Sequence, residues 1–165
     1  RYASRGLGDV YKRQVIDMSV ETMSKLYELK NIVGVKDATG DLKRVDSQLK
    51  SMGKEFIQLT GNDDNALEFN KRGGVGAIGV TANIAAKLSS DFQKACKKDM
   101  DEAVKLDKIL QPLHSSLFIE SNPSPVKYAA SLLKMCSPSV RLPLVEIRDE
   151  TKKKVSDALK SAKLL

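Results

Sequence analysis

The sequence has little of what several large classes of protein require. It contains no tryptophan, one histidine and two cysteines in 165 residues. No apolar run reaches the roughly 18 to 20 residues of a membrane-spanning helix, and the first residues hold no apolar stretch typical of a secretory signal. We therefore expect neither a membrane protein nor a secreted one.

The cysteines and the histidine are too sparse for a metal site or a disulfide framework. Cys96 and Cys136 lie far apart in the chain, and we predict two free thiols, buried or half-buried, in a reducing cytoplasm. His114 has no cysteine or acid near it at the spacing of metal ligands. We interpret it as a structural residue and expect no metal.

The net charge of +7 does not favour a nucleic-acid-binding protein. Four basic residues and one acid fall within residues 1–14, and the remaining lysines are interleaved with acids, which is typical of a solvated surface. No basic patch contains interleaved aromatic residues. Residues 1–14 lack any periodicity and resemble translated cloning sequence, so we predict a non-native or disordered tail there.

Three units of a strand followed by a helix are predicted after that tail. Apolar runs at residues 31–36, 56–60 and 76–80 have the length of strands, and apolar residues at helical spacing separate them. Consecutive units of this kind form a parallel sheet. Beyond the third strand the pattern is helical only, with amphipathic stretches at about 84–97, 99–117, 125–136 and 149–162.

Three parallel strands cannot close a barrel, since a (β/α)8 barrel needs about 250 residues. The pattern fits a small open α/β domain or part of a barrel, and the abrupt start favours the second. We predict an α/β fold: the C-terminal part of a (β/α)8 TIM barrel, comprising its last three βα units, followed by an all-helical C-terminal domain. The predicted parts are a tail at 1–14, a partial barrel with βα units 6–8 at 15–98, and the helical domain at 99–165.

Lys36 is the candidate for covalent chemistry, because it ends the first predicted strand and ligands bind at the carboxyl ends of parallel strands. An apolar lumen disfavours a charged lysine, and the neutral amine attacks carbonyl carbons. Gly61 follows the second predicted strand, and Ile78 lies within the third, at the same open face. By residue type alone, Lys36 could equally be a solvated charge and Gly61 a turn glycine. Asp63 or Asp64 could act as an acid or base, but a helix-capping role is preferred.

A resemblance to a known family rests on five segments. They are NIVGVKDATGDL (31–42), LTGNDD (59–64), GGVGAIGVTAN (73–83), PLH (112–114) and LFIESNPSPVK (117–127). In this order and spacing, over about residues 15–165, the chain resembles the C-terminal half of dihydrodipicolinate synthases (4-hydroxy-tetrahydrodipicolinate synthases). The NPSPVK stretch favours this family over sialic-acid lyases and sugar-acid aldolases of the same superfamily.

The resemblance implies a class I pyruvate aldolase. The residue matching Lys36 would form a Schiff base with pyruvate, and the resulting enamine would attack aspartate semialdehyde to give 4-hydroxy-tetrahydrodipicolinate in lysine and diaminopimelate biosynthesis. Ile78 and Gly61 would line the pyruvate site. No metal or organic cofactor is implied. The full-length enzyme would be a cytoplasmic homotetramer that binds neither nucleic acid nor membrane.

Family members relay protons through tyrosine and threonine residues, and hold the second substrate with an arginine, in the half that is absent here. We therefore expect this chain by itself to be inactive. Three alternatives stay open. The first is another pyruvate-dependent enzyme of the superfamily, acting on N-acetylneuraminate or a keto-deoxy sugar acid. The second is a non-catalytic α/β interaction domain, and the third is a basic RNA-binding module.

Overall fold

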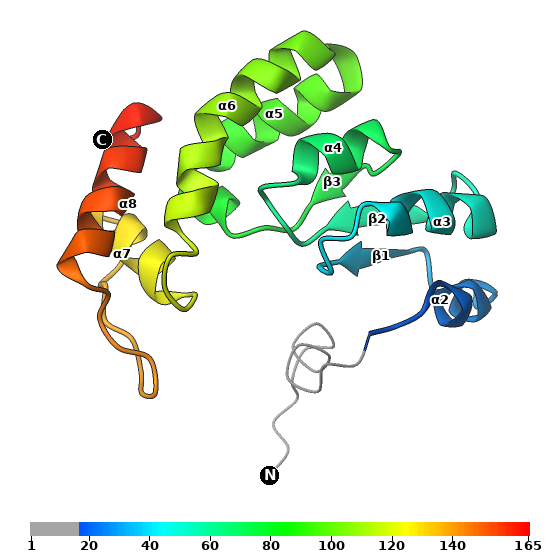
Figure 1. Ribbon diagram of the computed structural model, residues 1–165, viewed down its shortest axis with the longest axis horizontal. Coiled ribbons are helices and arrows are strands. Elements are labelled where there is room, and N and C mark those ends of the chain that lie inside the picture. The colour runs from blue at the N-terminus through cyan, green and yellow to red at the C-terminus, as the bar shows by residue number, and fades with distance from the viewer. Residues whose placement is uncertain (1–16) are drawn as a thin grey trace.

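The computed structural model describes residues 17–165 (Figure 1). The predicted tail at 1–14 lies outside the described residues. The elements are α2 (Val20–Tyr27), β1 (Gly34–Asp37), α3 (Lys43–Met52), β2 (Ile57–Thr60), α4 (Ala66–Lys71), β3 (Gly76–Ala77), the 3-10 helix η1 (Thr81–Asn83), α5 (Ala86–Lys98), α6 (Met100–Ser116), α7 (Ser124–Leu132) and α8 (Asp149–Ser161).

The three strands form one parallel sheet in the order β1-β2-β3, which confirms the predicted βα units. Lys36 pairs in register with Leu59, and Leu59 pairs with Gly76. Strand β3 has two residues, whereas the sequence predicted a strand over 76–80. Strand β3 is shorter because the backbone N–H groups of Val80 and Thr81 donate to the Asp63 carboxylate and not to a neighbouring strand.

The helix ends around the sheet follow from local chemistry. Ser19 caps α2, because its hydroxyl accepts a hydrogen bond from the backbone N–H of Thr22 at 3.1 Å. Asp41 does the same for the backbone N–H of Lys43 at the start of α3, at 2.9 Å. Helix α3 ends at Gly53, whose φ of 80° is a conformation that residues with a side chain rarely adopt.

Helices α2 and α3 cover the outer face of β1 and β2. A small core of Met23, Met52 and Phe56 lies between them, with Val35 of β1 against it. The rings of Tyr27 and Phe56 meet edge to face, with centroids 5.0 Å apart. The outer face of β1 and β2 is therefore closed by packed side chains, which are apolar in this core and polar at the buried Asp37 and Gln58.

A larger core joins the rest of the molecule. Helix α5 packs along α6, and α8 packs on both α6 and α7 (Figure 1). Fully or almost fully buried residues of this core come from α4 through α8, among them Ala66, Phe92, Leu110, Ala129 and Val155. Because this core runs across residue 98 without interruption, the division between 15–98 and 99–165 stays a prediction.

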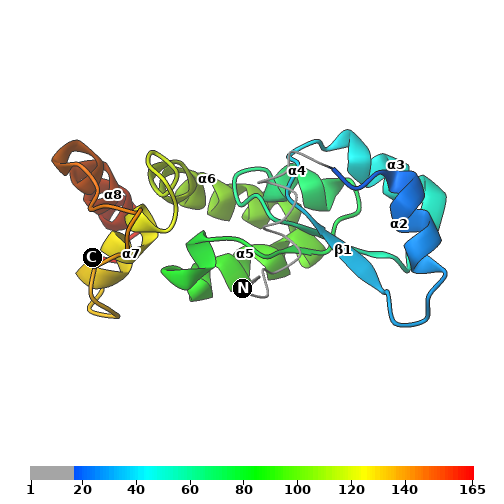
Figure 2. The same ribbon diagram turned by 90° about the horizontal axis from the view of Figure 1, so that it is seen from below.

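The chain is elongated, with α2 and α3 at one end and α7 and α8 at the other (Figures 1 and 2). Between α7 and α8 the segment 133–148 projects from the body in Figure 1, and its Leu142 is 87% exposed. Among residues 17–165, no helix is both long and apolar enough to cross a membrane.

The two thiols differ in their surroundings. Cys96 is half-buried on α5, as predicted, and burial raises the pKa of its thiol. Cys136 is exposed, so the prediction of a buried or half-buried thiol is wrong for this residue. It is exposed because it belongs to the projecting segment and not to a helix packed on the core.

Candidate functional site

The three residues singled out from the sequence lie at one edge of the sheet. Lys36 is the next-to-last residue of β1, Gly61 follows β2, and Ile78 follows β3. Hydrogen bonds continue the sheet past the strand ends: Gly61 N–H donates to the Asp37 carbonyl at 2.6 Å, and Ile78 N–H donates to the Thr60 carbonyl at 2.9 Å. The carboxyl ends of the parallel strands therefore bring the three predicted residues together, as expected.

Gly61 lies directly against the Lys36 side chain. A Cβ placed on Gly61 would be 2.8 Å from Cε of Lys36 and 2.7 Å from Cβ of Ala38, closer than carbon atoms can approach. Because Gly61 has no side chain, the Lys36 side chain has room to extend across the end of β2.

The inner face of the sheet is open in the described part of the chain. Lys36 is exposed, Ile57 of β2 is 43% exposed and Ile78 is 52% exposed. The expectation that Lys36 sits in a water-poor lumen is therefore wrong for this chain. Three strands are too few to close into a barrel, so in residues 17–165 no strand lies opposite Lys36 to exclude water from it.

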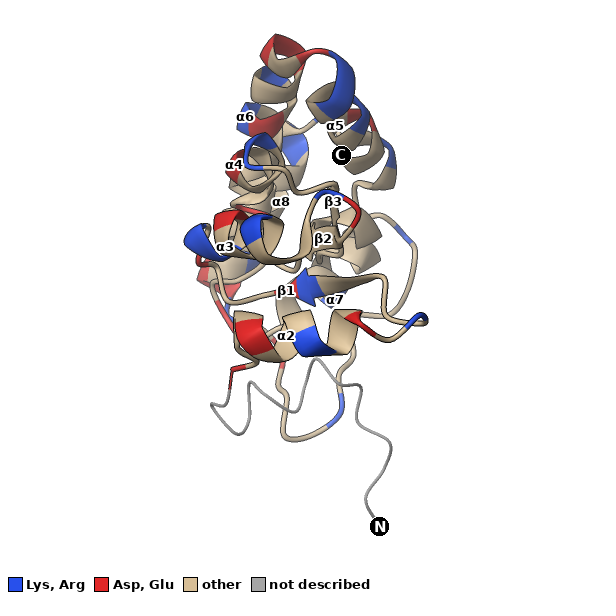
Figure 3. Cartoon of the chain, turned by 90° about the vertical axis from the view of Figure 1, so that its right-hand side faces the viewer, with Lys and Arg blue, Asp and Glu red and all other residues tan. Residues whose placement is uncertain are grey.

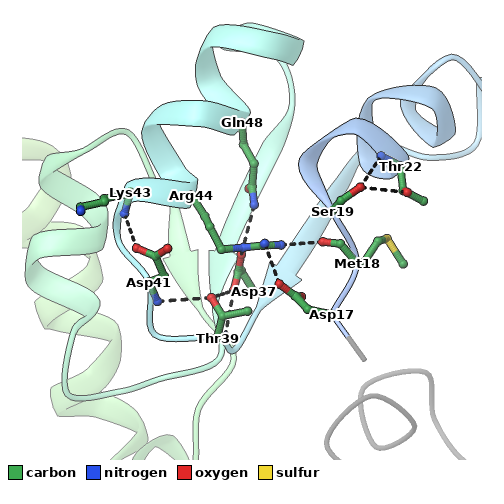
Figure 4. A network of polar contacts seen from close by, with 10 residues as sticks. All are labelled: Asp17, Met18, Ser19, Thr22, Asp37, Thr39, Asp41, Lys43, Arg44 and Gln48. Atoms are coloured by element: carbon green, nitrogen blue, oxygen red, sulfur yellow. Dashed lines mark hydrogen bonds and ion pairs between the residues drawn. The ribbon is translucent and has the colours of Figure 1, made fainter. Parts of the chain in front are cut away.

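A network around Asp37, missed by the sequence analysis, fixes the turn after Lys36 (Figure 4). The Asp37 carboxylate accepts hydrogen bonds from the backbone N–H and the hydroxyl of Thr39, at 2.9 and 2.6 Å. On its other oxygen it accepts from Nε of Arg44 at 2.8 Å and from Nε2 of Gln48 at 3.1 Å. Two side chains of α3 thereby bind Asp37, the residue that follows the candidate lysine.

Arg44 extends this network to the start of α2. Its guanidinium also donates to the Asp17 carboxylate at 2.7 Å and to the Met18 carbonyl at 2.8 Å. Burial disfavours a charged Asp37, but the hydrogen bonds from Thr39 and Arg44 outweigh it and hold the pKa of this carboxyl below its usual value. The strand end that carries Lys36 is thus anchored by a buried carboxylate that stays charged.

The carboxylates after β2 do not act as the sequence predicted. The residue in the capping position just before α4 is Asn65, and its side chain makes no capping bond. Asp63 instead accepts hydrogen bonds from the backbone N–H groups of Val80 and Thr81, at 2.6 and 3.0 Å. Asp64 is exposed. The expected capping of α4 by one of these acids is wrong, because Asp63 reaches across to the segment after β3.

His114 is buried on α6 and contacts that same segment. Its Nδ1 lies 2.7 Å from the hydroxyl of Thr81. Burial holds the pKa of His114 below its ordinary value of 6.5, although the nearby carboxylates of Asp63, Asp107 and Asp64 oppose this. The interpretation of His114 as a structural residue agrees with its burial and with its hydrogen bond to Thr81.

Charge and metal-binding groups around the site give no second candidate. Within residues 17–165, no group of three or more histidine, cysteine, aspartate or glutamate side chains is placed to hold a metal ion. In the view of Figure 3, basic and acidic residues alternate over α3 and over the α5–α6 pair. This alternation is typical of a solvated surface and not of a nucleic-acid interface.

These features define a class of protein. Three consecutive βα units with parallel strands, a lysine at a strand end and a following helical region are part of a (β/α)8 barrel with its C-terminal extension. More narrowly, the chain belongs to the dihydrodipicolinate synthetase family, whose pattern it matches over residues 7–162.

Individual relatives agree with this assignment. The chain is 69% identical, over 157 residues, to a 4-hydroxy-tetrahydrodipicolinate synthase of Pelagibacter ubique, with 93% of this chain and 54% of the relative covered. A dihydrodipicolinate synthase from Acinetobacter baumannii, solved in complex with pyruvate, is 36% identical with a TM-score of 0.86, covering 92% of this chain and 52% of that one. A synthase described as a monomeric variant is 31% identical with a TM-score of 0.84, covering 88% and 50%. The chain spans about half the length of the relatives it matches.

Proposed function

We propose that this chain carries the pyruvate-binding lysine of a 4-hydroxy-tetrahydrodipicolinate synthase. In this proposal Lys36 forms a Schiff base with pyruvate, and Gly61 and Ile78 line the site. The second substrate is aspartate semialdehyde, and the product is 4-hydroxy-tetrahydrodipicolinate. Residues 17–165 would supply this part of the site in a protein about as long as the relatives.

The observation that carries the proposal is the approach of Gly61 to Lys36. The lysine leaves β1 on the inner face of the sheet, and a side chain at Gly61 would collide with Cβ of Ala38 and displace the end of the Lys36 side chain. Ile78 follows at the end of β3, hydrogen-bonded through its N–H to Thr60. The family membership and a pyruvate complex of a similar structure support this site over an interaction domain without chemistry.

The reaction follows from the chemistry of an amine and a ketone. The neutral amine of Lys36 adds to the keto carbon of pyruvate, and the adduct loses water to leave a protonated imine. The imine withdraws electrons from the methyl group, which gives up a proton and becomes the carbon of an enamine. That carbon attacks the aldehyde carbon of aspartate semialdehyde, whose oxygen takes up a proton and becomes the 4-hydroxyl group. The amino group of the same substrate then adds to the imine carbon and expels the amine of Lys36, which closes the ring and frees the product.

The open inner face argues against turnover by this chain alone. Lys36 is exposed, and water around an amine favours its charged form and also hydrolyses imines. We expect the complete reaction only where further strands cover Ile57 and Ile78 and exclude water from the lysine. For the whole protein we propose a cytoplasmic homotetramer, although one similar structure is described as a monomeric variant.

The proposal is tested in a chimera in which residues 17–165 replace the matched part of the Pelagibacter ubique relative. The chimera is incubated with pyruvate, reduced with borohydride, and digested for mass spectrometry. We expect the reduced pyruvate adduct on the peptide that contains Lys36. Lys36→Arg keeps the positive charge but cannot form an imine, so it should lose the adduct. Lys43→Arg changes an exposed lysine at the start of α3, and this control variant should keep the adduct on Lys36.

Turnover of the same chimera separates the candidate substrates. Loss of aspartate semialdehyde in the presence of pyruvate is expected, with no cleavage of N-acetylneuraminate or a keto-deoxy sugar acid. An adduct on Lys36 together with sugar-acid cleavage would assign the chain to the lyases of the same superfamily. No adduct on Lys36 in a folded chimera would refute the enzyme proposal.

A further inference from the structure

The backbone after β3 needs an anchor that the sheet does not provide. The ladder between β2 and β3 ends with the bond from Ile78 N–H to the Thr60 carbonyl. From Gly79 onward the chain leaves the sheet and enters η1 at Thr81. Because Ile78 is the last residue held by the ladder, its position depends on what holds the residues that follow it.

The first anchor is Asp63, on the loop after β2. Asp63 is 9% exposed, and its carboxylate accepts from two successive backbone N–H groups, those of Val80 and Thr81, at 2.6 and 3.0 Å. Hydrogen bonds to a charged acceptor are about twice as strong as neutral ones. Gly79 lies flat against the same carboxylate, and a Cβ there would overlap the carboxylate atoms.

The second anchor is His114, on α6. Its Nδ1 bonds to the hydroxyl of Thr81 at 2.7 Å, and both side chains are buried. Helix α6 packs on α5 and α8, so this bond ties the segment after β3 to the helical part of the molecule. The segment is thus held from the sheet side by Asp63 and from the helical side by His114.

We propose that Asp63 and His114 are positioning residues that fix the backbone of Gly79–Thr81 and so hold Ile78 beside Lys36 and Gly61. This rests on the proposed function, in which Ile78 borders the pyruvate. The proposal gives the helical region a part in the site. Helix α6 helps to fix the position of Ile78 through His114, although α6 itself does not contact the substrate.

Hydrogen exchange of the full 165-residue chain tests the anchoring directly. Both N–H groups donate to the same carboxylate oxygen, Oδ2, so Asp63→Asn keeps the size of the side chain and an oxygen that can accept from both, but removes the charge of the acceptor. We expect the amides of Val80 and Thr81 to exchange about tenfold faster in this variant, because two charge-assisted hydrogen bonds become neutral ones, while α3 amides are unchanged. Asp64→Asn, at the exposed neighbouring acid, is the matched control and should leave all of them unchanged.

The pyruvate dependence of Lys36 trapping, in the chimera described above, tests the consequence for the site. Asp63→Asn should raise the half-saturating pyruvate concentration about tenfold, with the amount trapped at saturation unchanged. Thr81→Val replaces the hydroxyl by a methyl group and should raise it about threefold to fivefold. Thr81→Ser restores the hydroxyl and should return it to within about twofold of the parent.

Each outcome has one meaning. If Val80 and Thr81 exchange at the parental rate in Asp63→Asn, and half-saturation is also unchanged, the positioning role is wrong. If Asp63→Asn does not fold, the Thr81→Val and Thr81→Ser pair decides, and equal behaviour of the two overturns the proposal. If the parent chimera forms no adduct, the proposed function fails, while hydrogen exchange still reports whether the segment is anchored.

Discussion

The two faces of the three-stranded sheet differ in what covers them. On the outer face, Phe56 is 3% exposed and packs against α2 and α3. Gln58 is 1% exposed and donates a hydrogen bond to the Val45 carbonyl of α3. On the inner face, Ile57 is 43% exposed. Successive residues of a strand point to opposite faces, so neighbours in the sequence differ in burial by more than tenfold.

The comparison shows that apolar side chains in a strand indicate which faces of the sheet favour burial. They do not show which faces are buried in residues 17–165. Parallel strands with apolar side chains on both faces require a cover on both. In residues 17–165 the helices cover the outer face, and Lys36, Ile57 and Ile78 remain exposed on the inner one. Substitutions on the outer face should therefore change the free energy of unfolding, whereas substitutions on the inner face should change self-association.

The largest contrast in stability is expected between adjacent residues on opposite faces. Phe56→Ala removes a buried ring that packs on Tyr27 and should lower the free energy of unfolding by about 3 to 5 kcal/mol. Ile57→Ala removes a half-exposed side chain and should cost less than about 1 kcal/mol. Urea denaturation followed by circular dichroism measures both. Equal losses would mean that the inner face is buried in solution.

A buried carboxylate sharpens the contrast on the outer side. Asp37→Asn leaves Arg44 without its buried partner and should lower the free energy of unfolding by about 3 kcal/mol. The pair of Asp46 and Arg72, at 2.6 Å, is exposed, so Asp46→Asn should cost less than about 1 kcal/mol. The same urea titration measures both variants, and a cost for Asp37→Asn no larger than that of the control would contradict the role of the network.

The Asp37 network also predicts an acid limb of stability. The folded-state pKa of Asp37 lies below its ordinary value of 3.8, so the unfolded chain takes up a proton first as the pH falls. The stabilisation is fully present above pH 3.8 and is lost as the pH falls from there through the lower folded-state pKa. Asp37→Asn should lack this part of the acid transition.

A smaller effect is expected at neutral to weakly acidic pH from His114. The folded-state pKa of this residue lies below 6.5, with Asp63, Asp64 and Asp107 as the carboxylates that face it. Folding therefore favours the neutral ring, and stability present above pH 6.5 is lost as the pH falls through the folded-state pKa, by about 1.4 kcal/mol for each pKa unit of difference. Free energies of unfolding against pH should slope in the parent and stay flat in His114→Asn over that window.

The smallest effect on stability, and a visible one on association, is expected on the inner face. Ile57→Lys places a charge on a surface that is already half-exposed, so the free energy of unfolding should change by less than about 0.5 kcal/mol. Exposed apolar surface and unpaired strand edges promote self-association. Light scattering at increasing concentration should therefore show less association for Ile57→Lys than for the parent, and an unchanged profile would refute the open inner face.

Sequence reasoning worked where the determining contacts are local. Apolar residues at helical spacing between the predicted strands, such as Val45, Leu49 and Met52, predicted a helix where α3 lies. It was wrong about β3, because the amides of Val80 and Thr81 are taken by Asp63 from a different loop. Spacing along the chain carries no information on that bond, since it depends on how two loops meet.

The candidate site divides in the same way. The positions of Lys36 and Gly61 at strand ends were predicted from the strands alone, and their meeting at one edge follows from parallel pairing. Ile78 was expected within a strand over 76–80, and it follows the shorter β3. Their roles in catalysis remain predictions. The hold of Arg44 and Gln48 on Asp37 was missed, because it requires the direction of side chains on α3 relative to β1.

By itself, the sequence determined the alternation of strands and helices, the parallel sheet and the lysine at the end of the first strand. These depend on periodicity and turn residues, which act over a few positions. Only the tertiary structure decided that Asp37 is a buried anchor, that Asp63 and His114 hold the segment after β3, and that Lys36 is exposed in this chain. Burial and long-range hydrogen bonds are properties of packed surfaces, and residues distant in the sequence supply those surfaces.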